Sequence, residues 1–377
     1  MKRDLALRVL GEIMGWDDAR AIEEFRWLSL ISRLKYDGYQ DFLAGVRFIE
    51  SLATWIQQFE TPAERTIAYQ FVRQVLVYVG PAEMQRLIEL LYPDCVQRRL
   101  VRIVAEAAGV PTYRVWADST TATAYDSLLR RTLFIGLSEG AHLDLFRRAN
   151  AGLISNEQVL LAAYADREKW RKLLEDLRDA LKESTATFRI IYLIDDFTGS
   201  GTTLLRKRPE GWRGKLATFR ASIDDVLATH FDAALTVCVH HYMATDVASV
   251  ELEKRQAEAL AELGPVAWFS DVAFSFGTLL PPTIPIDRST LRAAKDFIVL
   301  AVKYCDREEL LKNRHFDEGP TKDPAFGFAD GALPLVLEHN TPNNSVALLW
   351  AETEGDKGAL PSRHSMRPLF RRRQRHV

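Results

Sequence analysis

Two adjacent carboxylates directly before a loop of glycines and hydroxyl side chains are the part of this sequence best suited to chemistry. Asp195 and Asp196 follow the apolar stretch Phe188–Ile194, and the loop Phe197–Thr203 comes after them. An apolar run rich in strand formers is typical of a buried strand in a parallel sheet, whose carboxyl end is where open α/β sheets bind ligands. We therefore expect the carboxylates to accept hydrogen bonds from vicinal sugar hydroxyls or to hold Mg²⁺ through water. Because neighbouring strand residues point to opposite faces, one of the two could instead be structural.

The loop after the carboxylates predicts a site for a phosphate monoester. Gly199 and Gly201 permit backbone conformations in which successive N–H groups converge on one anion, and hydroxyl side chains add further donors. A helix beginning directly after the loop would add its positive end. The candidate phosphate-binding residues are Thr198, Gly199, Ser200, Gly201, Thr202 and Thr203. Neither a Walker loop, which needs a lysine after its last glycine, nor the dinucleotide fingerprint, whose acid comes about 20 residues later, describes this segment.

Residues 1–114 predict an all-helical N-terminal region. One of its helix starts is signalled by Thr61, which can cap, by Pro62, which needs no donor at the first helical position, and by Glu64, which can reach back to the cap. The segment Gly80–Glu83 repeats this pattern before another helix.

Residues 115–355 predict an α/β domain with a mainly parallel sheet flanked by helices, because short apolar runs alternate with helical patterns. The expected strands are Thr132–Leu137, Phe188–Ile194, Ala234–Val239 and Val266–Phe269. The expected helices are Asn156–Leu181 and Ile223–Thr229. Near the end of the domain, Leu333–Leu337 and Val346–Trp350 predict a hairpin around a polar loop.

Two further polar clusters have both a functional and a structural interpretation. His339, Asn340 and Asn343 lie between apolar runs and could read a base, and asparagines are also what tight turns use. His240 and His241 are adjacent on a predicted strand, so their side chains should face opposite ways and not chelate one ion together.

Composition and charge describe an ordinary soluble globular chain. Of the 377 residues, 47% are hydrophobic and 27% charged, and the formal net charge of −2 gives no electrostatic reason to expect nucleic acid or a membrane. No apolar stretch reaches the roughly 20 residues of a membrane span, and the three cysteines lack metal-ligand spacing, so we expect a cytoplasmic protein. Residues 356–377 form a basic tail that we expect to be poorly ordered. Its Arg371–Arg375 run is either solvated or contacts an acidic partner or nucleic acid.

The segment Ile194–Thr203 resembles the ribose-5-phosphate motif of type I phosphoribosyltransferases. In that family the paired acids contact the ribose hydroxyls of phosphoribosyl pyrophosphate (PRPP), and the loop after them grips the 5-phosphate. Together with Phe134–Ala141, Phe146–Arg148 and His339–Asn344, it is similar to a phosphoribosyltransferase-like subgroup associated with bacterial conflict and antiviral-defence loci, over about residues 30–355. The resemblance implies binding of PRPP or a related nucleotide with Mg²⁺. It also implies, by association, an effector or sensor that works with a defence-system partner protein.

The resemblance also implies a pyrophosphate-binding loop at Gly136–His142, and here the sequence departs from the family. The candidates for this role are Ser138, Glu139, Gly140, Arg147 and Arg148. Glu139 would repel pyrophosphate unless Mg²⁺ intervenes, and the two arginines would either compensate or be ordinary solvated helix charges.

Two further departures concern the segments around the ribose-phosphate motif. An ordered amphipathic helix is expected over Ser155–Lys182, where the family has a flexible lid that excludes water. Arg206–Lys215 interrupts a normally continuous helix, either as a substrate-facing insertion or as a surface loop. Two functional hypotheses follow. One is an enzyme that transfers or hydrolyses at ribose C1, and the other is a non-catalytic ligand sensor that acts through a partner protein.

Overall fold

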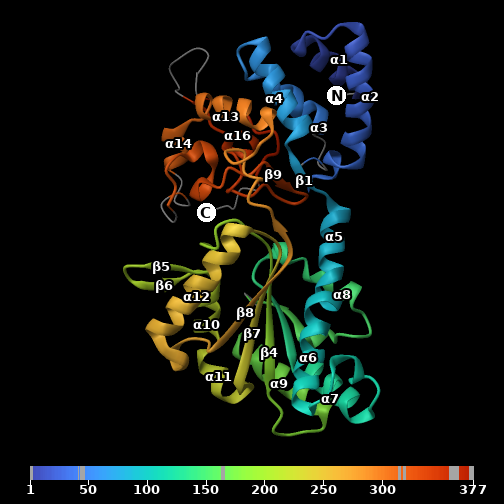
Figure 1. Ribbon diagram of the computed structural model, residues 1–377, viewed down its shortest axis with the longest axis vertical. Coiled ribbons are helices and arrows are strands. Elements are labelled where there is room, and N and C mark those ends of the chain that lie inside the picture. The colour runs from blue at the N-terminus through green and yellow to red at the C-terminus, as the bar shows by residue number, and fades with distance from the viewer. Residues whose placement is uncertain are drawn as a thin grey trace. The chain divides into compact units, whose positions relative to one another are not determined.

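The chain divides into two units, each with its own hydrophobic core, in a computed structural model (Figure 1). The structure describes residues 3–40, 42, 47–162, 166–312, 316, 320–355 and 365–372. The sheet unit spans Gln85–Leu280, and the helical unit combines Met1–Met84 with Pro281–Val377. The predicted boundaries after residues 114 and 355 differ from this division. The reason is that the chain beyond Leu280 adds buried residues to the core of the helical unit.

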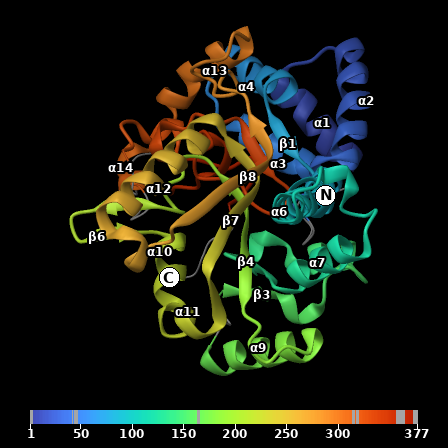
Figure 2. The same cartoon turned by 60° about the horizontal axis from the view of Figure 1, so that its bottom comes forward.

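A parallel sheet with the strand order β3-β2-β4-β7-β8 is the centre of the sheet unit, and Figure 2 shows β4, β7 and β8 side by side. Its strands are β2 (Thr132–Gly136), β3 (Val159–Leu161), β4 (Phe188–Thr198), β7 (Phe231–Thr245) and β8 (Asp271–Leu280). All four neighbouring pairs run parallel, so the carboxyl ends of the strands lie at one edge. The predicted α/β class with a mainly parallel sheet is confirmed.

Helices flank this sheet, as expected. They are the final part of α5 (Pro81–Leu90), the π-helical η3 (Leu91–Gln97), α6 (Arg98–Ala108), α7 (Ser119–Arg130), α8 (Leu143–Ala149), α9 (Arg167–Leu181), α10 (Lys215–Ser222), α11 (Asp224–His230) and α12 (Asp246–Ala267). Short 3₁₀ turns are η4 (Thr112–Arg114), η5 (Glu139–Ala141) and η6 (Asn156–Gln158). Trp170 of α9, Phe219 of α10 and Leu252 of α12 are buried in one core with Ile191 and Leu193 of β4. These three helices therefore cover the same face of the sheet.

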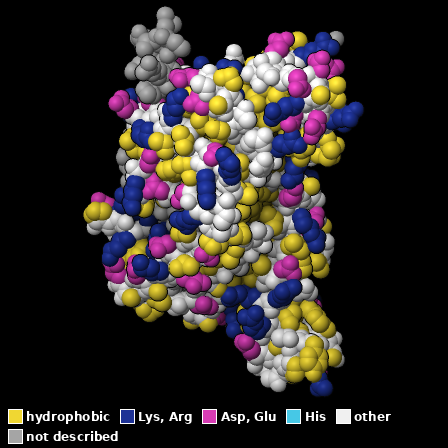
Figure 3. All heavy atoms as spheres, turned by 45° about the horizontal axis from the view of Figure 1, so that its top comes forward, with side chains coloured by type: hydrophobic (Ala, Val, Ile, Leu, Met, Phe, Trp, Pro, Cys, Tyr) yellow, Lys and Arg dark blue, Asp and Glu magenta, His cyan; other side chains and the backbone are white. Residues whose placement is uncertain are grey.

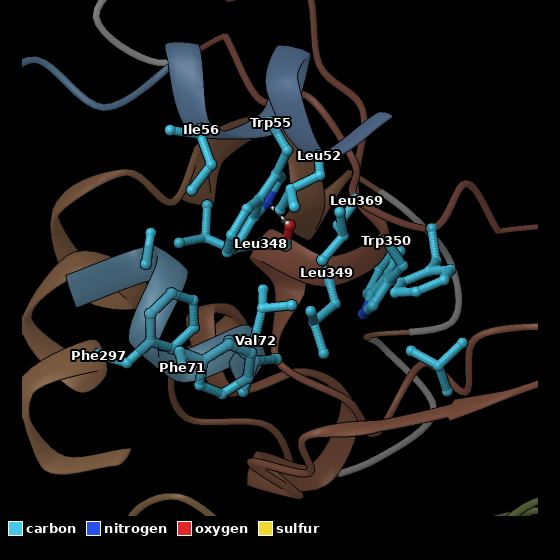
Figure 4. Packing of buried hydrophobic residues seen from close by; sticks show 14 of the residues in the cluster. Leu52, Trp55, Ile56, Phe71, Val72, Phe297, Leu348, Leu349, Trp350 and Leu369 are labelled. Atoms are coloured by element: carbon cyan, nitrogen blue, oxygen red, sulfur yellow. Dashed lines mark hydrogen bonds between the residues drawn. The ribbon is translucent and has the colours of Figure 1, made fainter. Parts of the chain in front are cut away.

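The helical unit is built from helices of both chain ends. They are α1 (Arg3–Met14), α2 (Asp18–Leu34), η1 (Tyr36–Gly38), α3 (Phe48–Gln57), α4 (Pro62–Gln74), α13 (Arg292–Lys303), α14 (Arg307–Leu311), η8 (Pro324–Phe326), η9 (Phe328–Asp330) and α16 (Ala347–Trp350). Figure 4 shows their packing: the indole Nε1 of Trp55 donates to the backbone oxygen of Leu348 at 2.7 Å. The rings of Phe71 and Phe297 stack with centroids 3.9 Å apart. Residues more than 200 positions apart thus share one core, which no local pattern predicts.

The predicted helix start at Thr61 is confirmed. Thr61 accepts from the backbone N–H of Glu64, the Glu64 carboxylate accepts from the N–H of Thr61, and Pro62 occupies the first turn of α4. This reciprocal capping satisfies two N–H groups that have no partner inside the helix. The pattern at Gly80–Glu83 also begins a helix, α5, with Gly80 donating to the Glu83 carboxylate.

Two predicted elements of the sheet unit are wrong. Val266 and Ala267 end α12 rather than forming a strand, and β8 begins only at Asp271. An apolar run this short fits the pattern of a helix as well as that of a strand. Here α12 continues past a kink at Gly264 and includes Val266 and Ala267. The expected helix Asn156–Leu181 is instead η6, the edge strand β3 and α9, because Val159–Leu161 finds a partner in β2.

In the helical unit, the predicted hairpin of Leu333–Leu337 and Val346–Trp350 is wrong. β9 (Leu335–Leu337) pairs in parallel with β1 (Val77–Val79), and Ala347–Trp350 is a helical turn. A partner strand more than 250 residues away replaces the local one.

The predicted disorder of the last residues is also wrong for part of the tail. Met366, Leu369 and Phe370 are fully buried in the core of the helical unit. Of the basic run, Arg371 pairs with Glu352 at 3.0 Å, whereas Arg373 and Arg375 lie outside the described residues.

The surface carries both signs of charge, and Figure 3 shows basic and acidic side chains interspersed over one face. Across the described residues, every helix is too short or too polar to cross a membrane.

Candidate functional site

Both candidate carboxylates lie inside β4, which continues to Thr198 and does not end before them as expected. Asp195 is in register with His241 of β7, and Phe197 with Met243. Pairing with the long strand β7 therefore extends β4 by four residues. The two acids differ in burial, since Asp195 is buried and Asp196 is partly exposed. Asp195 and Asp196 accordingly have different environments and should have different roles.

Asp195 is buried and both of its carboxylate oxygens are engaged. Its exposed fraction is 3%. The Ser138 hydroxyl donates to Oδ1, and the Lys215 ammonium forms an ion pair with Oδ2. A desolvated carboxylate costs several kcal/mol unless it is paired and hydrogen-bonded, and here it is both. The sequence left open whether both acids face the ligand or one of them is structural, and these contacts favour the structural alternative for Asp195.

Asp196 is only partly buried and lies against the loop after β2. A Cβ added to Gly140 would come within 2.7 Å of Asp196 Oδ2, so the absence of a side chain at Gly140 makes room for this carboxylate. The loop itself is held by Tyr242, whose hydroxyl donates to the Ala141 backbone oxygen at 2.8 Å. Burial, together with Asp195 and Asp196, raises the pKa of the Tyr242 phenol, which keeps it a donor.

The predicted phosphate loop has the backbone of an anion-binding turn. Gly201 has a φ of +70°, the left-handed conformation that glycine favours. Its N–H donates to the Thr198 hydroxyl at 3.2 Å, and the N–H of Thr202 donates to the Ser200 hydroxyl at 3.4 Å. Hydroxyl oxygens of the loop itself thus occupy acceptor positions that an anion's oxygens could take.

The N-cap residue and a side chain of helix α12 hold this loop by hydrogen bonds. Thr245, which also caps α12, donates its hydroxyl hydrogen to the Gly199 backbone oxygen at 2.7 Å. Arg255 donates from Nη1 to the backbone oxygens of Ser200 at 3.0 Å and Leu205 at 3.2 Å. Thr245 and Arg255 thus hold the backbone oxygens of Gly199, Ser200 and Leu205 from one helix.

We expect Arg255→Leu to lower the free energy of unfolding by about 1–3 kcal/mol, because two carbonyl oxygens lose a charged donor. Urea unfolding at neutral pH measures this change. Lys254→Leu is the matched control, since it removes a charge from an exposed position on the same helix. Equal stability of the two variants would contradict the anchoring role of Arg255.

A hairpin, not a helix, follows the phosphate loop. β5 (Arg206–Arg208) and β6 (Gly211–Arg213) pair antiparallel, and the chain then returns to the loop. The N–H of Lys215 donates to the Thr203 oxygen at 3.0 Å, and Leu216 donates to Leu204 at 3.0 Å. Gly214, with a φ of +113°, makes this return possible, because a Cβ there would lie 2.5 Å from the Leu204 oxygen. The expected interruption at Arg206–Lys215 therefore ends by placing Lys215 beside Asp195.

The remaining pyrophosphate-loop candidates lie in the loop after β2 and on α8. Glu139 begins the turn η5, and both Arg147 and Arg148 are exposed on α8. Arg148 lies 3.5 Å from Asp144 one turn earlier, a surface ion pair.

The base-loop candidates belong to the helical unit. Leu337 and Asn340 exchange two backbone hydrogen bonds, which makes Glu338-His339 the centre of a tight turn. His339 Nδ1 lies 3.2 Å from the Glu338 carboxylate, and the Asn343 backbone oxygen accepts from Phe328 at 2.7 Å. These contacts agree with the turn interpretation and do not test base recognition.

His240 and His241 have different partners, as strand alternation predicts. His240 Nδ1 lies 2.9 Å from the Ser275 hydroxyl, whereas the His241 ring packs on Phe276. Burial lowers the pKa of His240 to about 3 and that of His241 to about 4, so both are neutral near pH 7.

The parallel sheet, with paired acids and a glycine–hydroxyl loop at the carboxyl end of its central strand, has the arrangement of a phosphoribosyltransferase-like protein. The chain belongs to the PRTase-CE family, a phosphoribosyltransferase-like family whose profile matches residues 52–372. Comparisons with curated proteins and with solved structures gave no match.

Proposed function

We propose that this protein binds a ribose 5-phosphate compound, either PRPP or a nucleotide, at Asp196 and the Thr198–Thr203 loop. The observation that carries the proposal is the position of a partly exposed carboxylate two residues before a preformed glycine–hydroxyl turn on the same strand end. Family membership supports the same ligand class.

On binding, oxygens of the 5-phosphate would replace hydroxyl oxygens of the loop as acceptors for its N–H groups. The N–H groups of Gly201 and Thr202 now donate to the hydroxyls of Thr198 and Ser200. A phosphate oxygen is a stronger acceptor than a hydroxyl, and the displaced hydroxyls would then donate to the phosphate as well. Because Arg255 and Thr245 already hold the backbone, little ordering would be needed on binding.

Asp196 would accept hydrogen bonds from the ribose hydroxyls. Asp195 would fix the end of β4 through its contacts with Ser138 and Lys215. Mg²⁺ is the ion that would accompany a pyrophosphate-bearing ligand, with Asp196 as its carboxylate.

A non-catalytic sensor is favoured over a transferase or hydrolase at ribose C1. The segment where transferases have a flexible lid contains α9, whose Trp170, Leu173 and Leu177 are buried in the sheet core. The loop after β2 carries Glu139, and the candidate arginines Arg147 and Arg148 are exposed on α8. A ligand bound here would then act through a partner protein, as an effector or sensor in a bacterial antiviral-defence system.

Calorimetry with ribose 5-phosphate, PRPP and AMP tests the proposal, with pyrophosphate release followed in parallel. We expect binding without turnover. Binding with turnover would make the protein an enzyme, and the absence of binding by all three ligands would remove the proposed function.

Gly140→Ala should weaken ribose 5-phosphate binding by about tenfold, because the new methyl group would displace the Asp196 carboxylate. Gly38→Ala is the matched control, since its Cβ would make only ordinary contacts, 3.4 Å to Pro81. Calorimetric titration of both variants measures the difference. Equal affinities would mean that Asp196 does not contact the ligand.

The defence role is tested by phage challenge of bacteria that carry this gene together with its neighbouring genes. Protection that is lost with Asp196→Asn supports a ligand-dependent role in defence, and protection that persists contradicts it.

A further inference from the structure

We propose that Lys215, and not a divalent cation, supplies the positive charge opposite Asp195, so that the ribose-phosphate site needs no metal at this carboxylate. The inference rests on the proposed function for its binding readout, and its stability readout is independent of that function.

The contacts of Asp195 leave no place for an ion. Mg²⁺ binds oxygen ligands in a near-octahedral shell and usually keeps several of its waters. Asp195 is 3% exposed, its Oδ1 accepts from the Ser138 hydroxyl, and its Oδ2 pairs with the Lys215 ammonium. A divalent cation placed here would have to displace the ammonium group or be repelled by it. The donor set at Asp195 therefore does not fit Mg²⁺.

Backbone contacts on both sides of Lys215 fix where its side chain begins. Lys215 is the first residue of α10, and its N–H is bonded to the Thr203 oxygen at the end of the phosphate loop. Gly214 allows the tight return of the hairpin to this point. At the far side of the hairpin, Lys207 pairs with Glu262 of α12, and the Trp212 indole donates to the same carboxylate at 3.1 Å. The inserted hairpin thus places Lys215 beside Asp195. One end of the hairpin is bonded to the phosphate loop, and the other contacts α12.

The charges around the pair are consistent with a fixed ammonium group. His241 is in register with Asp195 on β7 and is buried. Burial lowers its pKa and outweighs the opposite effect of Asp195 and Asp196, while Lys215 lowers it further, so the ring stays neutral near pH 7. Asp196 is partly exposed and lies against Gly140 of the loop after β2. The Asp195 carboxylate is thus neutralised by Lys215 inside the protein, and the ligand would bind at Asp196.

The first test uses ribose 5-phosphate, which lacks the pyrophosphate group that would itself carry Mg²⁺. Its affinity for the full chain is measured by calorimetry in EDTA and in millimolar Mg²⁺. For the wild type we expect the two dissociation constants to agree within about twofold. For Lys215→Met we expect weaker binding in EDTA, by about tenfold, and partial recovery with Mg²⁺, because the vacated position beside Asp195 can then take a cation. A purely structural lysine would not make the affinity respond to Mg²⁺.

Two variants keep the test decisive if Lys215→Met is poorly folded. The double variant Asp195→Asn/Lys215→Met has no charge at the pair, so we expect it to regain stability and to be indifferent to Mg²⁺. Lys254→Met is the matched control, because it removes an exposed lysine of α12 in the same unit. It should behave as the wild type.

The stability readout is the unfolding temperature of each protein with and without Mg²⁺. Lys215→Met should unfold about 5 °C or more below the wild type. Of the proteins tested, only this variant should have a higher unfolding temperature in Mg²⁺. The inference is overturned if Mg²⁺ changes the affinity or unfolding temperature of the wild type and Lys215→Met by the same factor. It is also overturned if Lys215→Met matches the wild type in both. If no protein binds ribose 5-phosphate, the proposed function fails, and the unfolding temperatures still decide the role of Lys215.

Discussion

Replacing Asp196 by Asn should weaken ribose 5-phosphate binding by at least about 100-fold while leaving the fold intact. Hydrogen bonds to a charged acceptor are worth about 1.5–3 kcal/mol each, and a carboxylate can accept from both hydroxyls of a vicinal diol. The amide of Asn has only one acceptor oxygen and presents a donor to the other hydroxyl. Because Asp196 is partly exposed, the substitution should cost little stability. Calorimetric titration, with circular dichroism as the check on folding, measures both effects.

Asp195→Asn is the informative comparison, because it makes the same chemical change one residue earlier. It leaves the Lys215 ammonium without its carboxylate, so we expect the larger loss in unfolding temperature and the smaller loss in affinity. The opposite order would mean that Asp195, not Asp196, contacts the sugar. Equal affinities for Asp196→Asn and the wild type would remove the site assignment.

Acidification should destabilise the sheet unit steeply between pH 6.5 and about pH 4, because His240 and His241 are buried as neutral rings. Burial lowers their pKa from 6.5 to about 3 and about 4. Above pH 6.5 both rings are neutral in the folded and unfolded states, so their contribution to stability is complete. Below pH 6.5 the histidines take up protons in the unfolded chain but stay neutral in the folded chain. The free energy of unfolding therefore decreases as the pH is lowered. Each histidine contributes a slope of about 1.4 kcal/mol per pH unit, so the two together reach roughly 3 kcal/mol per unit.

Urea unfolding at pH 7, 6 and 5 measures this slope. The double variant His240→Gln/His241→Gln should be less stable at pH 7 and should lose most of the pH dependence in this window. His230→Gln is the control for the removal of a histidine that is less deeply buried. An unchanged slope in the double variant would show that other groups cause the acid sensitivity.

The sequence by itself determined the class of fold, the capping of α4 and the order of acids, glycines and hydroxyls at the end of β4. Each of these depends on residues close together in the chain. The apolar run Phe188–Ile194, rich in β-branched and aromatic residues, favours a buried strand, and the Thr61–Glu64 cap closes within one helical turn. Strand alternation likewise predicted that Asp195 and Asp196, and His240 and His241, would have different partners.

Tertiary structure alone decided which carboxylate is buried and what neutralises it. Ser138 reaches Asp195 from the loop after β2, and Lys215 reaches it from beyond a hairpin, so the pair depends on contacts 57 and 20 residues apart in the chain. Arg255 acts on the phosphate loop from a different helix, and its sequence neighbours give no sign of that role. In the helical unit, β9 pairs with β1 and Phe370 enters the core for the same reason. Hydrophobic periodicity and capping signals do not determine which strand a strand pairs with or which charged groups become buried together. Contacts between residues far apart in the chain decide both.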